Sequence, residues 1–210
     1  MKVCPGVYTF DLDWNRGEPL SVHVVKTAEG SILFGSGDET TAEQIVAIAR
    51  EYDIDTVVVE HGDVDHYRGV PALRAELDIE VAVPEGDAGF LLDEDIEPDH
   101  RLTDGEVYRG VLAIELPGHT PGNMAFLYEG VLIAGDTVAG VDSKYAAAGE
   151  WSGQLTVMDR DHNAMDQRAR RAVARLADYE IETVLVTHGS NVLEAGGDAV
   201  QTLIKDLEAA

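Results

Sequence analysis

The chain has 210 residues, 45% of them hydrophobic, which is typical of one globular domain spanning residues 1–210. Its 40 acidic and 15 basic side chains give a formal net charge of -25, so charge repulsion argues against nucleic acid and anionic membranes as partners. No apolar run approaches the length of a transmembrane helix, and the N-terminus lacks a signal-peptide core, so we expect a cytoplasmic location.

The acidic residues are scattered along the chain and alternate with apolar runs, which is not the pattern of a disordered acidic tail. We interpret them as an acidic shell around an ordinary core, as in halophilic proteins that work in concentrated salt. An ordinary acidic cytosolic protein is the alternative. The single cysteine, Cys4, excludes an internal disulfide.

The first sixty residues predict strands, a helix and a buried strand, in that order. Short apolar and alternating runs separated by turn residues predict strands at 7–12, 20–27 and 31–36. Apolar residues at helical spacing predict a helix over 40–52. The wholly apolar run within 54–60 predicts a buried strand, so strands and helices alternate from here on.

The next fifty residues continue this alternation less clearly. Residues 65–77 have a helical pattern, but Pro71 lacks the amide hydrogen that a helix interior needs, so the helix starts late or kinks there. Residues 79–86 predict another buried strand. The acidic stretch 84–109 has no clear pattern, and we leave its structure open.

The second half of the chain has clearer elements. They are, in chain order, strands at 111–119, 123–130 and 130–136, a loop at 139–162, a helix at 164–179, a strand at 181–189 and a helix at 198–210. Runs of strands with intervening helices predict an α/β (or α+β) fold of two sheets with helices packed outside them. The loop is a candidate lid or substrate wall.

Four segments place metal-ligand residue types directly after an apolar strand. They are IDTVVVEHGDVDH, IELPGHTPGN, VLIAGDT and ETVLVTHGS. Each alone is compatible with a polar loop or a turn. Strand ends that meet at one edge can bring distant side chains together on rigid supports, so the four segments jointly predict a metal site.

With these motifs the chain resembles the metallo-β-lactamase-fold superfamily, whose hallmark is HxHxDH followed by a His, an Asp and a His. The matching segments are His61-Gly62-Asp63-Val64-Asp65-His66, His119 in PGHTPG, Asp136 in GDT and His188 in THG. The resemblance covers nearly the whole chain. It implies a four-layer αβ/βα sandwich, in which two mixed β-sheets are flanked by helices.

The resemblance also implies two adjacent divalent metal ions, zinc ahead of iron or manganese. The implied ligands are His61, Asp63 and His119 for the first ion, Asp65, His66 and His188 for the second, and Asp136 as a bridge between them. Asp65 and His66 are the residues that we assign to catalysis. Two such ions can share a hydroxide and polarise a carbonyl oxygen.

Asp63 departs from the family pattern, which has histidine at this position. A third ligand carboxylate besides Asp65 and Asp136 makes the metal core more neutral, so bound water is less acidic and iron or manganese is favoured over zinc. Two alternatives stay open: Asp63 reaches the first metal only through water, or that metal binds weakly. A second departure is Gly35, which stands where relatives often have a supporting aspartate.

We expect support for the metal loop from Ser36 or Asp38, unless it is absent. Trp14, Tyr145 and His162 are candidate pocket walls.

The favoured function is hydrolysis of a small ester, thioester or lactone by a metal-bound hydroxide. An iron-dependent oxidoreductase acting on dioxygen, nitric oxide or a persulfide is the alternative, and a metal-binding protein without catalysis is the third. A hydroxyacylglutathione hydrolase is disfavoured because little chain remains for its usual C-terminal region. The expected partner is a small-molecule substrate, and a homodimer stays open.

The acidic shell yields a first prediction. Raising potassium chloride from about 0.01 M to about 1 M shortens the Debye length from roughly 30 Å to roughly 3 Å, which screens the repulsion among the excess carboxylates. The melting temperature, followed by circular dichroism, should therefore rise over this range. A flat or falling melting temperature would contradict the halophilic interpretation.

Overall fold

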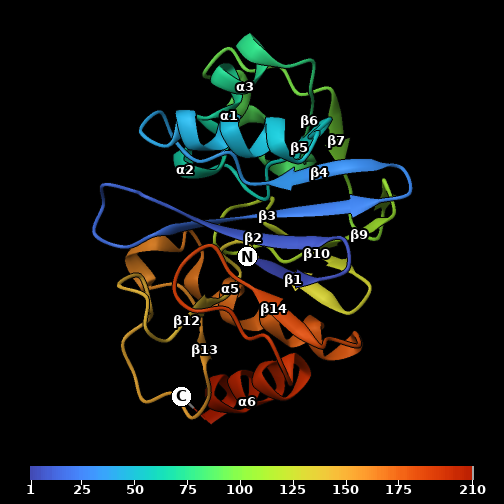
Figure 1. Ribbon diagram of the computed structural model, residues 1–210. Helices are drawn as coiled ribbons and strands as arrows, with labels where there is room; N and C mark the ends of the chain where they lie inside the picture. The colour runs from blue at the N-terminus through green and yellow to red at the C-terminus, as the bar shows by residue number, and fades with distance from the viewer. Residues whose placement is uncertain (210) are drawn as a thin grey trace.

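The structure, a computed structural model that describes residues 1–209, contains two β-sheets that lie face to face with helices on their outer sides (Figure 1). The first sheet has seven strands in chain order: β1 (Lys2–Cys4), β2 (Val7–Leu12), β3 (Leu20–Thr27), β4 (Gly30–Phe34), β5 (Thr56–Val58), β6 (Glu80–Pro84) and β7 (His100–Leu102). Strands β1 to β4 pair antiparallel, and β4 to β7 pair parallel.

Helical crossovers join the parallel strands, because each chain return must pass over the sheet. The crossovers contain α1 (Ala42–Glu51), then α2 (Val64–Tyr67) and α3 (Val70–Glu76), then the 3₁₀ turn η1 (Glu85–Asp87) and α4 (Ala88–Leu92). Pro71 breaks the predicted helix into α2 and α3, as its missing amide hydrogen requires. The segment 84–109, whose structure the sequence left open, contains η1, α4, β7 and a further short strand, β8 (Val107–Tyr108).

The second sheet has five strands in the order β14-β11-β10-β9-β8, with β14 parallel to β11 and the others antiparallel. They are β8 (Val107–Tyr108), β9 (Val111–Glu115), β10 (Met124–Tyr128), β11 (Val131–Ile133) and β14 (Thr183–Leu185). The segment predicted as a long loop forms a two-stranded ribbon of β12 (Ala139–Gly140) and β13 (Leu155–Thr156), followed by the 3₁₀ turn η2 (Arg160–His162).

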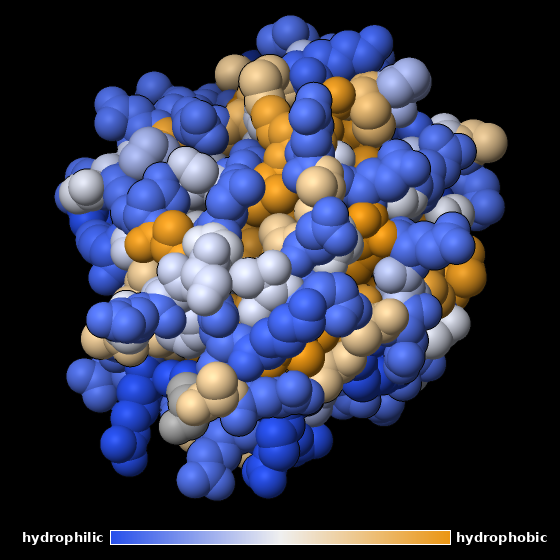
Figure 2. Space-filling model, turned by 90° about the horizontal axis from the view of Figure 1, so that it is seen from below, coloured by the Kyte–Doolittle hydropathy of each residue, from blue (hydrophilic) through white to orange (hydrophobic). Residues whose placement is uncertain are grey.

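Two helices cover the outer face of the second sheet. The predicted helix at 164–179 is α-helical only as α5 (Asp166–Ala172) and continues as the 3₁₀ segment η3 (Val173–Asp178). The last helix, α6 (Gly196–Ala209), lies at the opposite end of the molecule from α1 and α3 (Figure 1). The view from that end shows mostly hydrophilic side chains with hydrophobic residues between them (Figure 2).

Three apolar clusters hold the layers together, and strand periodicity explains them. Alternate side chains of a strand point to opposite faces, so Leu33 packs toward α1 while Phe34 packs between the sheets. Phe34 meets Phe126 of β10 with ring centroids 5.1 Å apart. The third cluster joins the second sheet to η3 and α6 through residues such as Val173 and Leu203. The predicted αβ/βα sandwich is thus confirmed.

Within residues 1–209, no helix combines the length and apolarity that crossing a membrane requires.

Candidate metal centre

The four ligand motifs meet at one edge of the sandwich. They follow β5, β9, β11 and β14, and the chain turns toward the same place after each strand. In the first motif, Asp63 occupies the N-cap position of α2 in extended conformation, which lets residues 61 to 66 fold around the centre. The loop is fastened to the end of β4, where Ser36 N and Oγ both donate to the carbonyl oxygen of His66 at 2.9 Å.

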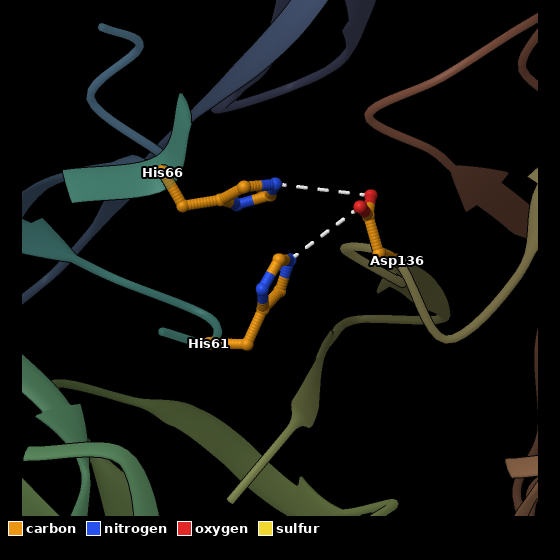
Figure 3. A group of neighbouring side chains, drawn as sticks. All are labelled: His61, His66 and Asp136. Atoms are coloured by element: carbon orange, nitrogen blue, oxygen red, sulfur yellow. Dashed lines mark ion pairs between the residues drawn. The ribbon is translucent and has the colours of Figure 1, made fainter. Parts of the chain in front are cut away.

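Asp136 lies at the middle of this cluster. Its Oδ1 is 3.7 Å from His66 Nε2, and its Oδ2 is 3.7 Å from His61 Nε2 (Figure 3). The same Oδ2 is 3.5 Å from His119 Nε2 and 3.6 Å from His188 Nε2. One carboxylate therefore faces an imidazole nitrogen from each of the four histidines.

The other ligand-type atoms fall into two sets on either side of Asp136. Within each set the atoms lie within 4.8 Å of one another, and the sets are His61, Asp63 and His119, and Asp65, His66 and His188. The structure thus brings all seven residues together in the grouping expected for a first and a second ion. Their roles as ligands and in catalysis stay predictions.

The donor atoms fit a divalent metal ion. His61 Nε2, His66 Nε2 and Asp136 Oδ1 are buried and lack any hydrogen-bond partner, although buried polar atoms are normally satisfied. Imidazole nitrogens and carboxylate oxygens at such positions are the ligands that zinc and iron prefer. A cation between them would satisfy all three atoms.

Carboxylates control the charges of the histidines in this cluster. Burial alone lowers the pKa of His66, but the Glu60 and Asp136 carboxylates outweigh it and raise that pKa to about 10. In the same way Asp136, Asp65 and Glu18 overcome burial and raise the pKa of His188 to about 9. Protons on these rings balance the carboxylates at neutral pH, and a metal ion would replace them.

His61 has the opposite electrostatic environment. Burial, and then the neighbouring His66, His119 and His188, hold its pKa well below the usual value. Its neutral imidazole is already in the form that binds metals.

Glu60 is a residue of the centre that sequence reasoning missed. Its side chain is 1% exposed, and its Oε2 lies 2.9 Å from His66 Nδ1, which leaves Nε2 of that ring directed at Asp136. A Cβ on Gly35 would lie 3.6 Å from Glu60 Oε2, so the carboxylate lies beside the position where the family resemblance implied a supporting aspartate. An acid directly after the buried run TVVV was the available signal.

Of the two residues from which support for the metal loop was expected, Ser36 holds that loop and Asp38 does not. Asp38 accepts hydrogen bonds from Trp14 Nε1 at 2.8 Å and from Thr40, and it contacts none of the seven predicted ligands. Ser36 acts on the backbone of His66, not on its ring.

Two further acids, the partly buried Glu18 and the buried Asp87, contact residues of the centre. Glu18 Oε1 lies 3.2 Å from His188 Nδ1. Asp87, in the segment without a clear sequence pattern, accepts hydrogen bonds from Gly62 N at 2.9 Å, Gly122 N at 2.7 Å and the Thr120 hydroxyl. Asp87 therefore ties the loop of the first motif to the loop that carries the His119 imidazole.

The centre opens into a cavity of about 420 Å³. Besides the predicted ligands, its lining includes Trp14, Arg16, Tyr67, Phe90, Tyr145, Met158 and His162. Trp14 stacks against His188 at 5.6 Å between ring centroids, and the Phe90 ring lies so close to Gly62 that a Cβ there would be 2.1 Å from it. Trp14, Tyr145 and His162 thus lie where pocket walls were expected.

This architecture defines a class: an αβ/βα sandwich with a histidine and aspartate metal site at the edge of its sheets. Residues 16–188 match the family model described as the metallo-beta-lactamase superfamily, and the chain belongs to that superfamily. A solved metallo-beta-lactamase from Pontibacter korlensis has the same fold, with a TM-score of 0.75 and 18% identity, covering 100% of this chain and 98% of that one.

Curated relatives match only parts of the chain. An uncharacterised protein of Aquifex aeolicus is 31% identical over 127 residues, which is 50% of this chain and 58% of the relative. A hydroxyacylglutathione hydrolase of Anaeromyxobacter dehalogenans is 38% identical over 82 residues, which is 37% of this chain and 30% of the relative. The chain thus spans 58% or less of the curated relatives it matches.

The Glu60 contact yields a second prediction. Glu60→Gln removes the charge that holds the Nδ1 proton of His66, so zinc affinity should fall roughly 10- to 100-fold, as is usual for partners of metal-binding histidines. Competition with a chromophoric chelator measures the affinity. Glu51→Gln, at an exposed position of α1, is the matched control and should bind like the wild type. Unchanged affinity in folded Glu60→Gln protein would contradict the assignment.

Proposed function

We propose that the chain is a metal-dependent hydrolase of a small ester, thioester or lactone. The observation that supports this most is the Asp136 carboxylate between two ligand sets, at the floor of an open cavity. Two divalent ions held there, zinc in the first instance, would supply Lewis acidity and a water of lowered pKa.

Asp65 and His66 are the catalytic residues of this proposal. Although burial opposes it, the His188 hydrogen bond and the nearby imidazoles hold the pKa of Asp65 far below its usual range, so it stays a carboxylate. Its Oδ2 is 3.5 Å from His188 Nε2 in the cavity, where it can accept a hydrogen bond from an attacking water. His66 would hold the second ion through its Nε2, fixed by Glu60.

The cavity favours a small substrate. Its volume of about 420 Å³ lies in the range of small-molecule sites, and aromatic side chains on its walls offer apolar surface to a substrate. The local similarity to a protein named as a hydrolase agrees with the proposed reaction class.

Hydrolysis of model substrates tests the proposal. Zinc-loaded protein should cleave at least one of a panel of small aryl esters, thioesters and lactones, and a chelator should abolish the activity reversibly. His188→Ala removes a ligand of the second ion, so it should lose one metal equivalent and more than roughly 100-fold in kcat/KM. His100→Ala is the control, because that ring pairs with Glu106 outside the cavity. Full metal content and activity in His188→Ala would refute the site.

An iron-dependent oxidoreductase is the second candidate, and Asp63 favours it. Asp63 Oδ2 lies 3.0 Å from His119 Nε2 within the first ligand set, so three carboxylates would face the two ions. Oxygen-rich ligand sets favour iron or manganese over zinc.

Asp63→His discriminates between the two candidates. The extra imidazole should raise the preference for zinc over manganese by about tenfold if residue 63 is a ligand, because nitrogen ligands favour zinc. Metal content after equilibration with equal zinc and manganese measures this preference, and Asp93→His, at an exposed position, is the control. An unchanged preference would assign Asp63 to hydrogen bonding alone. Iron with visible absorption in the purified wild type would favour the oxidoreductase.

A further inference from the structure

The walls of the cavity differ in charge from the rest of the chain. Acidic residues outnumber basic ones by 40 to 15. Among the described residues that line the cavity, however, the only acids are the three ligand carboxylates, Asp63, Asp65 and Asp136. The remaining lining residues include the cation Arg16 and no acid. Apart from the ligand carboxylates, the charged side chain that lines this cavity is therefore a cation, Arg16, although the chain as a whole is strongly acidic.

Arg16 lies in the loop between β2 and β3, and the hydrogen-bond donors of its guanidinium have no acceptor among the described residues. Its side chain is 52% exposed, and its Cζ lies 5.3 Å from the centroid of the Trp14 ring. Its nearest carboxylate is Asp38 at 3.9 Å, which already accepts hydrogen bonds from Trp14 and Thr40. Within residues 1–209 no group accepts a hydrogen bond from this guanidinium, so its donors are available to a ligand.

Several other arginines of the chain are paired much more closely. Arg68 lies 2.7 Å from Glu94, and Arg109 lies 2.6 Å from Glu80. Arg16 instead lines the cavity beside the candidate metal centre, with no described carboxylate closer than 3.9 Å.

A second cation lies beside Arg16. Lys144 Nζ is 4.6 Å from the centroid of the Tyr145 ring and 6.0 Å from that of Trp14, and it donates to the backbone oxygen of Arg16. No described carboxylate forms an ion pair with Lys144 Nζ, whereas Glu18 Oε2 accepts a hydrogen bond from the Lys144 backbone N at 2.9 Å. Two cations therefore border the two aromatic rings that flank His188.

We propose that the substrate carries a carboxylate, which Arg16 binds at the mouth of the cavity with Lys144 beside it. The apolar body of the substrate lies against Trp14, Tyr145 and Phe90, and the bond to be cleaved reaches Asp136. A guanidinium fork binds a carboxylate through two parallel hydrogen bonds, which gives orientation as well as affinity. Only the position of the cleaved bond rests on the proposed function.

The kinetic test uses two aryl acetates that differ only in a ring carboxylate or a ring carboxamide. The wild type should prefer the carboxylate, and Arg16→Gln should reduce that preference roughly fivefold through KM, as expected for a partly exposed charge pair. Arg16→Lys should retain part of it, and about 1 M potassium chloride should weaken it. Arg101→Gln, exposed on β7 and outside the cavity lining, is the control.

A binding test separates this inference from the proposed function. Phenylacetate and phenylacetamide are titrated into zinc-loaded protein with Trp151→Phe, which leaves Trp14 as the single fluorescent indole. Loss of the phenylacetate preference on Arg16→Gln supports the inference even if no ester is cleaved. A preference that persists would overturn it, because the metals would then hold the carboxylate and Arg16 would only cover Trp14. Ester cleavage that ignores the ring charge also overturns it, while the hydrolase proposal stands.

Discussion

The balance between buried imidazoles and buried carboxylates is the constraint on which this structure depends. Removing such groups from water costs several kcal/mol for each charge unless opposite charges compensate it. Asp136 satisfies this condition by facing four rings at 3.5 to 3.7 Å, and Glu60 and Glu18 add charge behind two of them. The two sheets maintain this balance of charges, because their strand ends fix the position of each charged side chain.

Most of the fold followed from sequence because it depends on local patterns. Apolar runs of strand length predicted the central strands, and Pro71 predicted the break between α2 and α3. The change from α-helix to 3₁₀ helix at Val173 was missed, because Ala169, Val173 and Leu176 have the spacing of a regular helix and only packing decides the winding. The strand β1 was missed because three residues carry too little periodicity.

One part of the candidate site could likewise be predicted from the sequence, and another part could not. Residues directly after strands predicted one shared site, since strand ends meet at an edge, and the family resemblance implied its division into two ligand sets. The residues that contact these ligands from behind could not be predicted, because their positions depend on how separate segments pack together. Glu60 reaches His66 beside a position that Gly35 leaves open, and Asp87 reaches Gly62 from a segment without a clear pattern. The two neighbouring cations at the mouth of the cavity could not be predicted either, because Arg16 and Lys144 are 128 residues apart in the sequence.

The close approach of Phe90 to Gly62 links two segments that differ in how freely their sequences can vary. Gly62 belongs to the metal motif, whereas Phe90 comes from α4, is 42% exposed and has room to turn outward. A Cβ at position 62 would meet the Phe90 ring first, so a side chain there would displace that ring and widen the entrance. In divergent homologues, the residue inside the motif and the residue on the helix should therefore covary, and this pair would adjust substrate size while the metal chemistry is preserved.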